Sequence, residues 1–174
     1  MKSIAALLAA FIAFTAFSAQ AADSALSPAA NAAFLADNAK KPGVVTRPSG
    51  LQYRIVHNGF GKRPLPTDMV TVYYTGALIN GTVFDGTEPG LPATFKTTEL
   101  IRGWTEALQL MREGDHWQIV IPSELGYGAR GAGNGTIPPN QTLVFDLQLV
   151  TVTTPKKEDK DPDEEQSSPG NGSE

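Results

Sequence analysis

The sequence contains no cysteine and only two histidines, His57 and His116, among its 174 residues. Without cysteine, this chain has no thiol nucleophile, no disulfide bond and no cysteine-ligated zinc site. The two histidines lie far apart in the sequence and do not have the spacing of metal ligands. Residues Gly126–Gly131 match the glycine pattern of dinucleotide-binding loops, but the glycines and prolines that follow prevent the helix which that site requires. We therefore expect neither a metal nor another cofactor.

Excess positive charge is also missing. Residues 22–153 carry 10 Lys or Arg against 11 Asp or Glu, and the residues after Thr154 carry 3 against 7. A near-neutral body with an acidic tail lacks the clustered cations that neutralise phosphate groups. We therefore expect no nucleic-acid partner.

No apolar run is long enough to span a membrane. The longest, Ile4–Phe17, falls short of the roughly 18 residues that a spanning helix needs. Lys2 precedes this run, and Ala19-Gln20-Ala21 follows it as a small-x-small cleavage site. The pattern predicts a signal peptide over residues 1–21, and hence a periplasmic or secreted protein without a membrane anchor. The alternative is a buried N-terminal helix.

The residues on either side of the central region differ from it in composition. An N-terminal segment, 22–48, is rich in alanine, and Ser27 followed by Pro28 predicts the start of a short helix that ends before Pro42-Gly43. Only Phe34 and Leu35 are large apolar residues there, so this helix is marginal by itself. Residues 154–174 have no large apolar side chain, which predicts a disordered acidic tail.

The central region, 49–153, shows the pattern of a β-rich domain with one helix. Alternating apolar and polar residues, or short apolar runs, predict extended segments at Leu51–Val56, Met69–Leu78, Thr82–Phe84, His116–Ile121 and Thr142–Val152. Asn80-Gly81 predicts a hairpin turn between the second and third of them. The helix is predicted over Ile101–Met111, where Leu100, Trp104, Leu108 and Met111 form a single apolar stripe. The expected fold class is α+β, with a bent antiparallel β-sheet wrapped around one short amphipathic α-helix.

Several aromatic and β-branched residues stand at the ends of these elements: Tyr74, Phe84, Phe95, Ile101, Trp104, Tyr127, Ile137 and Phe145. For each of them alone, a hydrophobic core is the alternative interpretation. Three features favour a pocket. Tyr127 lies in a glycine-rich loop with little core to join, Tyr74 and Asp85 add polar groups to an apolar set, and Asp85 follows Phe84 at the end of a hairpin.

Six blocks of sequence carry a resemblance to a known family: Val72–Gly76, Phe84-Asp85, Ile101–Trp104, Ile121–Gly128, Ile137–Asn140 and Leu143–Leu147. In order and spacing they resemble the FKBP-type peptidyl-prolyl cis–trans isomerases from about Gly50 to Val152. Gly43–Thr46, Ser49–Tyr53 and Pro92–Phe95 are similar to the exported bacterial branch that includes the macrophage infectivity potentiators.

The resemblance implies an isomerase that rotates X-Pro bonds during the folding of exported proteins. It implies catalytic roles for four residues, Tyr74, Asp85, Trp104 and Tyr127, with Trp104 as the floor of a proline pocket. It implies substrate contacts for Phe84, Phe95, Leu100, Ile101, Ile137 and Phe145, with a hydrogen-bond donor at the Ile101 backbone N–H. The implied partners are proline-containing polypeptides and the macrolide inhibitors rapamycin and tacrolimus.

Two departures from the family leave parts of the expectation open. Many eukaryotic members have an aromatic residue where this chain has Ala93, which should widen one wall and leaves macrolide fit and substrate preference undecided. The bacterial branch often dimerises through a long N-terminal helix, whereas this chain has only the short Ser27–Lys41 segment, so its oligomeric state stays open. A periplasmic holdase chaperone and a non-catalytic peptide-binding module are the alternative functions.

Overall fold

A computed structural model describes residues 25–155. The expected signal peptide and residues 156–174 of the expected acidic tail lie outside this range. Within residues 25–155, seven strands form one sheet: β1 (Val44–Thr46), β2 (Gln52–His57), β3 (Met69–Leu78), β4 (Val83–Gly86), β5 (Ala93–Lys96), β6 (His116–Ile121) and β7 (Leu143–Thr153). Their order is β1-β2-β6-β7-β3-β4, with β5 also paired to β3, and every pairing is antiparallel.

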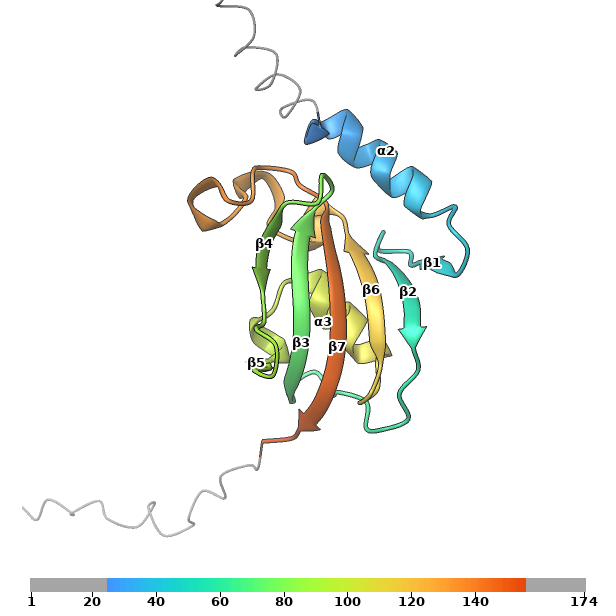
Figure 1. The fold of residues 1–174 in the computed structure, drawn as a ribbon, viewed down its shortest axis with the longest axis vertical. Coiled ribbons are helices and arrows are strands. Elements are labelled where there is room, and N and C mark those ends of the chain that lie inside the picture. Colours follow the sequence, from blue (N-terminus) through green and yellow to red (C-terminus); the bar gives the residue numbers. More distant parts are fainter. Residues whose placement is uncertain (1–24, 156–174) are drawn as a thin grey trace, which may run out of the picture.

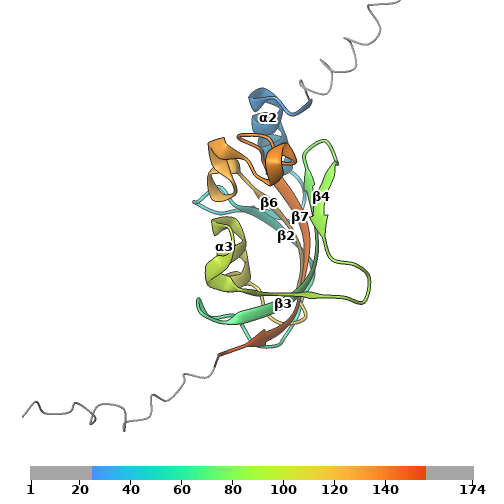
Figure 2. The same cartoon turned by 90° about the vertical axis from the view of Figure 1, so that its left-hand side faces the viewer.

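In the described part of the chain two α-helices accompany the sheet, α2 (Pro28–Asn38) and α3 (Arg102–Leu110). Short 3₁₀ turns, η1 (Thr97–Glu99), η2 (Ser123–Leu125), η3 (Gly128–Arg130) and η4 (Gly133–Gly135), lie in the connections. The sheet curves around α3, which lies against its concave face, while α2 lies at one end of the sheet (Figures 1 and 2). The expected α+β class, with a bent antiparallel sheet around one amphipathic helix, is confirmed.

Helix α3 is held by the apolar stripe that its sequence predicts. Trp104 and Leu108 are buried, as is Met111 just after the helix, and Leu100 before it is half-buried. Gly103 lets the helix approach the sheet, because a Cβ atom there would lie only 2.5 Å from the Ile121 side chain on β6. The concave face supplies much of the rest of the core: Val70, Val72, Trp117, Ile119, Ile121, Leu143, Phe145, Leu147 and Leu149.

The hairpin between β3 and β4 forms at the predicted turn. Gly81 has a φ of +86°, a conformation that glycine adopts without steric cost. The Leu78 N–H donates to the Thr82 carbonyl at 2.9 Å, and the Thr82 N–H donates to the Asn80 side chain at 3.0 Å. This turn determines where β4 runs, and therefore where Asp85 is placed.

Two strands were not expected from the sequence. β1 has three residues and pairs only with β2, and β5 has four residues and pairs only with β3. Neither is long enough to show a period of two. The other five strands lie where the sequence predicts them, with ends that differ by two residues at most.

Helix α2 begins where the sequence predicts it. Ser27 caps it by accepting the Ala30 N–H at 3.2 Å, and Pro28 occupies the first turn. Its two large apolar residues, Phe34 and Leu35, are half-buried, whereas Asn31 and Asn38 are buried.

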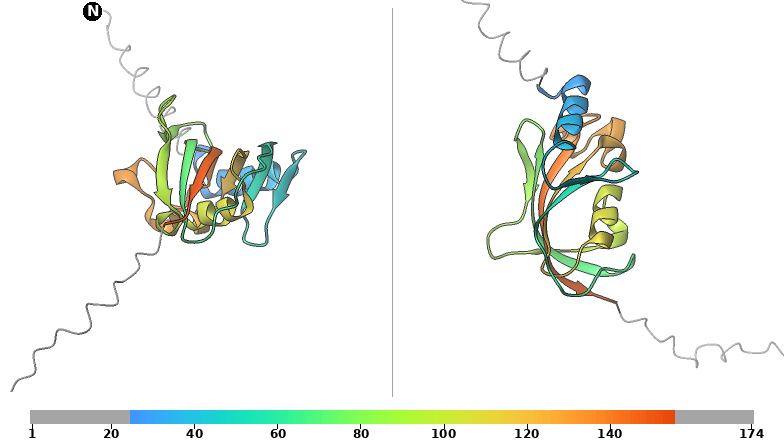
Figure 3. Two further views of the ribbon diagram at one scale, coloured as in Figure 1. Left: turned by 90° about the horizontal axis from the view of Figure 1, so that it is seen from below. Right: turned by 90° about the vertical axis from the view of Figure 1, so that its right-hand side faces the viewer.

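The docking of α2 depends on hydrogen bonds between side-chain amides. Asn31 Nδ2 donates to Gln141 Oε1 at 3.1 Å, and Asn31 Oδ1 accepts the Thr142 N–H at 2.7 Å. Asn38 Nδ2 donates to Gln52 Oε1 at 2.8 Å. We call Asn31, Asn38, Gln52 and Gln141 the amide clamp. Figure 3 shows that α2 lies beside the β1–β2 end of the sheet and the loop before β7.

None of the helices formed by residues 25–155 is both long enough and apolar enough to cross a membrane.

Candidate active site

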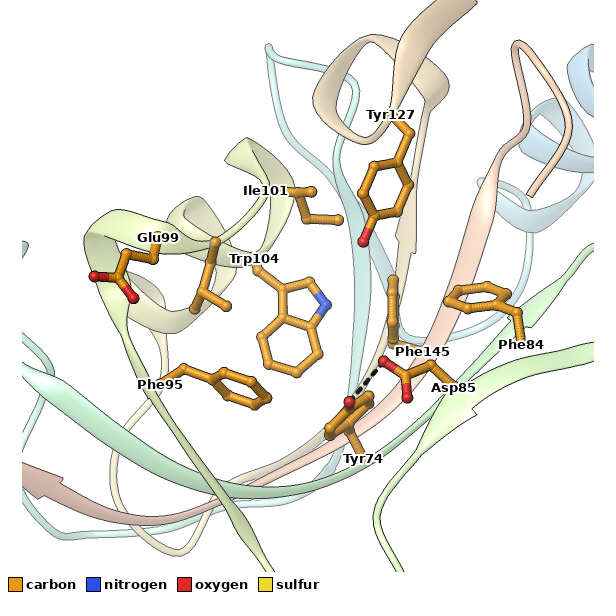
Figure 4. A pocket seen from close by; sticks show the side chains of 10 residues that line it. Tyr74, Phe84, Asp85, Phe95, Glu99, Ile101, Trp104, Tyr127 and Phe145 are labelled. Carbon is orange, nitrogen blue, oxygen red and sulfur yellow. Dashed lines mark hydrogen bonds between the residues drawn. The ribbon is translucent and has the colours of Figure 1, made fainter. Parts of the chain in front are cut away.

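A cavity of about 280 Å³ opens between the N-terminal end of α3, the edge of the sheet and the loop after β6 (Figure 4). Its lining residues are Tyr74, Phe84, Asp85, Phe95, Glu99, Leu100, Ile101, Trp104, Tyr127 and Phe145. The structure thus brings together nine of the ten residues singled out from the sequence. We call this cavity the aromatic pocket.

Trp104 forms the floor of the aromatic pocket from the first turn of α3. Its side chain is 3% exposed, and its ring meets three others nearly at right angles. The ring centroids lie 5.2 Å away for Tyr74, 6.0 Å for Phe95 and 5.3 Å for Phe145, with interplanar angles of 89°, 85° and 85°. Edge-to-face contacts of this kind are favourable and directional. The floor of the pocket is therefore held in one orientation by its walls.

The opposite wall of the pocket depends on Gly76, a residue whose role the sequence pattern does not reveal. Phe84 and Phe145 pack edge to face at 5.6 Å and 87° directly over Gly76 of β3. A Cβ atom on Gly76 would lie 2.6 Å from the Phe145 ring and 2.7 Å from the Phe84 ring. Any other residue at this position would push the two rings apart. Gly76 belongs to the block Val72–Gly76, but the sequence does not show that Phe84 and Phe145 pack over it.

The polar groups of the pocket form one short chain of hydrogen bonds. The Tyr74 hydroxyl donates to Asp85 Oδ2 at 2.7 Å (Figure 4). Asp85 Oδ1 accepts the Gly86 N–H at 2.9 Å. Burial raises the pKa of Tyr74 well above its ordinary value, and the hydrogen bond to Asp85 and the charge of Asp85 raise it further. Tyr74 is therefore a neutral phenol at physiological pH, and Asp85 fixes the direction of its hydroxyl.

Two donors at the mouth of the pocket have no acceptor within residues 25–155. The Tyr127 hydroxyl points into the pocket from the loop above it, and no described residue accepts a hydrogen bond from it. Burial, followed by the charge of Asp85, raises the pKa of Tyr127, so this hydroxyl also stays protonated. The Ile101 N–H is the second donor, because Ile101 caps α3 and only its carbonyl is bonded there, to Trp104 N and Thr105 N. Both are available to a ligand.

Ile137 does not reach the pocket. Its side chain is 6% exposed and packs in the hydrophobic core, while its backbone exchanges hydrogen bonds of 2.9 and 3.0 Å with Ala132. Ile137 thus closes the glycine-rich loop instead of lining the cavity. Ala93, expected to widen one wall, is also absent from the lining residues.

Glu99 lines the cavity although nothing in the sequence pointed to it. Its carboxylate forms an ion pair with Lys96 at 3.2 Å and is directed away from Trp104 in Figure 4. Both side chains are exposed, so the pair contributes little to stability. The stem of Glu99 borders the cavity, but its charge does not enter it.

The arrangement suits a small apolar ring bound among aromatic side chains, with its flanking main chain held by two neutral donors. Within the described part of the chain, no three His, Asp or Glu side chains come together as metal ligands. The one carboxylate in the pocket that faces Trp104, that of Asp85, is already engaged by Tyr74 and Gly86. The groups present favour binding and orientation over covalent chemistry.

Comparison with known proteins agrees with this geometry. The family model described as FKBP-type peptidyl-prolyl cis-trans isomerase matches residues 61–150, and the model described as the domain amino terminal to it matches residues 1–55. The outer membrane protein MIP of Legionella longbeachae is 54% identical over 125 residues, which are 71% of this chain and 53% of that protein. The FKBP-type 22 kDa peptidyl-prolyl cis-trans isomerase of Escherichia coli is 50% identical over 71% of this chain and 60% of that protein. The chain thus spans little more than half the length of these relatives.

Solved structures show the same fold. The crystal structure of a peptidyl-prolyl cis-trans isomerase from Pseudomonas syringae is 38% identical, covers 76% of this chain and 96% of that one, and has a TM-score of 0.69. Escherichia coli FkpA is 39% identical over 80% of this chain and 70% of that one, with a TM-score of 0.63. With a matching family model, homologous sequences and a shared fold, the chain belongs to the FKBP-type peptidyl-prolyl cis–trans isomerase family.

Proposed function

We propose that this protein is a peptidyl-prolyl cis–trans isomerase whose active site is the aromatic pocket. The observation that carries the proposal is the arrangement around Trp104. Three rings hold it from the sides, Asp85 orients Tyr74, and Tyr127 and the Ile101 N–H are unused donors at the mouth. Family membership supports the same activity.

The reaction needs no proton transfer and no covalent intermediate. Rotation about an X-Pro bond is slow because the C–N bond has partial double-bond character, with a barrier of ~18–20 kcal/mol. An enzyme has only to bind the twisted amide more tightly than either planar form. Twisting localises the nitrogen lone pair and reduces the amide dipole, so an apolar pocket with little water favours the twisted state.

Each group of the pocket has a role in this mechanism. The proline ring lies on Trp104, between the aromatic walls. Tyr127 and the Ile101 N–H hold the carbonyl groups that flank the proline, so that one side of the bond stays fixed while the other rotates. Asp85 acts as a positioning residue through Tyr74, with no role as a general base. Leu100 borders the entrance.

We also propose the setting in which the enzyme works. The substrates are proline-containing stretches of folding polypeptides, residues 1–21 are a signal peptide, and the protein acts in the periplasm or outside the cell. Residues 49–153 form the isomerase domain, preceded by segment 22–48 and followed by the acidic tail. The apolar run after Lys2, and relatives such as the outer membrane protein MIP, support export. Rapamycin and tacrolimus are proposed ligands of the same pocket.

The test is the cis-to-trans rate of a short X-Pro peptide with the purified protein, with and without rapamycin. Acceleration that rapamycin blocks supports both the activity and its assignment to the aromatic pocket. A folded protein that gives no acceleration contradicts the proposal. If that protein still suppressed aggregation of unfolded chains, the holdase alternative would take its place.

A further inference from the structure

A second cavity, of about 410 Å³, lies at the other end of α3. Its apolar part is formed by Ile55, Phe60, Leu110 and Trp117, and its rim by Arg63 and Arg112. We call these six residues the second groove. It shares no lining residue with the aromatic pocket, which lies at the N-terminal end of α3.

The apolar side of the second groove is open to solvent. Phe60, in the connection between β2 and β3, is 91% exposed, and Ile55 at the end of β2 is 43% exposed. Beneath them, Trp117 is buried and stacks on Tyr53 with ring centroids 4.4 Å apart. An exposed phenylalanine beside a hollow gains free energy from any apolar group that covers it.

The rim of the second groove carries unused positive charge. Arg63 Nη1 donates to the Gln109 carbonyl at 3.0 Å, and Arg112 Nη1 donates to the Gly61 carbonyl at 3.4 Å, which holds both side chains over the groove. Neither guanidinium forms an ion pair with a carboxylate of residues 25–155. Each guanidinium has five N–H donors, so most of them remain available to an anion.

The acidic residues nearby do not neutralise this rim. Asp115 also lines this cavity, but it is 4% exposed and accepts the backbone N–H groups of Gly59 and Arg112. The Asp68 side chain is fully buried and pairs with Lys62 at 3.3 Å. Glu113 accepts the backbone N–H groups of Lys62 and Val152. Asp68 Oδ2 also accepts the Leu65 N–H, while the buried Asp68 Oδ1 has no hydrogen-bond partner within residues 25–155. None of these three carboxylates forms an ion pair with Arg63 or Arg112.

The chain leaves the domain beside this rim. Strand β7 ends at Thr153, and the hydroxyl of Thr154 accepts a hydrogen bond from Lys62, the neighbour of Arg63 in sequence. The end of β7 and the β2–β3 connection lie at the same end of the sheet (Figure 1). Residues 156–174 carry seven acidic side chains and three lysines, and include the run Asp161-Pro162-Asp163-Glu164-Glu165. Six extended residues from Pro155 reach about 20 Å, enough to cross the rim.

We propose that residues 158–165 of the acidic tail dock in the second groove of their own chain. The carboxylates of the tail pair with Arg63 and Arg112, and Pro162 packs on Phe60. Charge complementarity and the point at which the chain leaves the domain favour the tail over another occupant. Because the tail is tethered beside the groove, its effective concentration there is of millimolar order, so weak contacts suffice. This inference does not rest on the proposed isomerase activity.

The absence of cysteine makes a direct test possible. A Gln166→Cys variant of the full chain carries a single thiol, to which a nitroxide spin label is attached. In an amide NMR spectrum we expect severalfold loss of peak height at Phe60, Leu110 and the Trp117 indole. The Trp104 indole, in the aromatic pocket, should keep its intensity and serves as the internal reference.

Charge variants show whether the arginines hold the tail. In R63Q/R112Q the broadening should disappear, whereas in R102Q/R130Q, which removes two exposed arginines outside the groove, it should remain. A third variant, D161N/D163N/E164Q/E165Q, alters only the tail and should also abolish the broadening. Broadening spread evenly over the domain, or unchanged in R63Q/R112Q, would overturn the proposal. A mixed sample provides a further test, in which spin-labelled chains without isotope labels are combined with isotope-labelled chains that lack the spin label. Broadening in the isotope-labelled chains would also overturn the proposal, because the tail of one chain would then occupy the groove of another.

Discussion

The two cavities at opposite ends of α3 are built from different interactions. In the aromatic pocket the rings hold one another at fixed angles, and the charge of Asp85 is met by Tyr74 and Gly86. In the second groove, Phe60 is almost fully exposed and two guanidinium groups keep unused donors. A rigid, nearly neutral cavity can distinguish a transition state from a ground state by shape and polarity. An open, charged cavity attracts an anionic partner but selects weakly between its conformations.

The largest expected effect comes from removing the floor of the pocket. Trp104→Ala deletes a buried ring that contacts three others, so we expect it to lower the free energy of unfolding by ~3–5 kcal/mol and to abolish isomerisation. Urea denaturation and the isomerisation rate measure the two effects. Trp117→Ala is the matched control: it removes the buried tryptophan of the second groove, at a similar cost in stability.

The comparison between the cavities requires that the two tryptophan variants differ in activity when both are folded. Circular dichroism identifies conditions under which each variant remains native. If folded Trp117→Ala lost as much activity as folded Trp104→Ala, the two cavities would not be functionally separate.

A smaller effect is expected from the free hydroxyl at the mouth of the pocket. Tyr127→Phe removes one donor to the substrate and leaves the aromatic ring, so the catalytic rate should fall roughly tenfold, the equivalent of ~1.4 kcal/mol. Tyr73→Phe is the control, because Tyr73 is next to Tyr74 on β3 but points to the other face of the sheet. Equal rates for Tyr127→Phe and the unaltered protein would show that the Tyr127 hydroxyl has no role in the reaction.

A pH titration should also detect the effect of Asp85 on the pKa values of Tyr74 and Tyr127. Asp85→Asn removes a negative charge from beside both phenols, so we expect the pKa values of Tyr74 and Tyr127 to fall toward the ordinary tyrosine value of about 10. In the unaltered protein both pKa values are raised, so the folded state holds these protons more tightly than the unfolded state does. Their contribution to stability is complete below about pH 10 and is lost as the pH rises through the folded values.

Phenolate absorbance against pH measures the ionisation directly, and urea denaturation on either side of about pH 10 measures its effect on stability. Asp85→Asn should lower the pH at which two of the four tyrosines ionise. An unchanged absorbance curve in Asp85→Asn would show that burial alone raises both pKa values.

Added salt should have the smallest effect on the isomerisation rate at the aromatic pocket. It should have a larger effect on the binding of the tail in the second groove. Exposed charge pairs are screened over about 8–10 Å at 0.1–0.15 M ionic strength. Higher salt should therefore weaken contacts of the tail with Arg63 and Arg112. The isomerisation rate of an uncharged X-Pro peptide should change less than about twofold, because the binding groups of the pocket are neutral. A strong salt dependence of that rate would show that a charged group contributes to binding in the pocket.

Local patterns in the sequence predict the parts of this fold that depend on neighbouring residues. Helix α3 was predicted because its apolar stripe repeats at helical spacing, and the β3–β4 hairpin because Asn80-Gly81 suits a tight turn. Nine pocket residues meet because the motifs stand at the ends of elements that converge on α3. Ile137 also stands in such a motif, but its loop turns inward and buries it.

Local sequence patterns do not predict polar contacts between residues that are far apart in the sequence. The partner of Asn31 is Gln141, 110 residues away, and that of Asn38 is Gln52. Asparagine in an alanine-rich segment looks like a solvent-facing residue until its partner is known. Glu99 likewise lies at the pocket only because η1 turns toward α3, and its residue type carries no such signal.

The amide clamp has a mechanical consequence. The Leu26 carbonyl accepts hydrogen bonds from both Asn31 Nδ2 and Gln141 Nε2, at 3.1 Å each. The neighbour of Gln141, Asn140, donates its N–H to the Gly128 carbonyl at 2.8 Å, one residue from Tyr127. Tension applied to the chain ahead of Leu26 would thus reach the loop that presents Tyr127 through Gln141 and Asn140, and the start of β7 through the hydrogen bond between Asn31 and Thr142. A pull from the N-terminal side would therefore act on the mouth of the pocket as well as on the sheet.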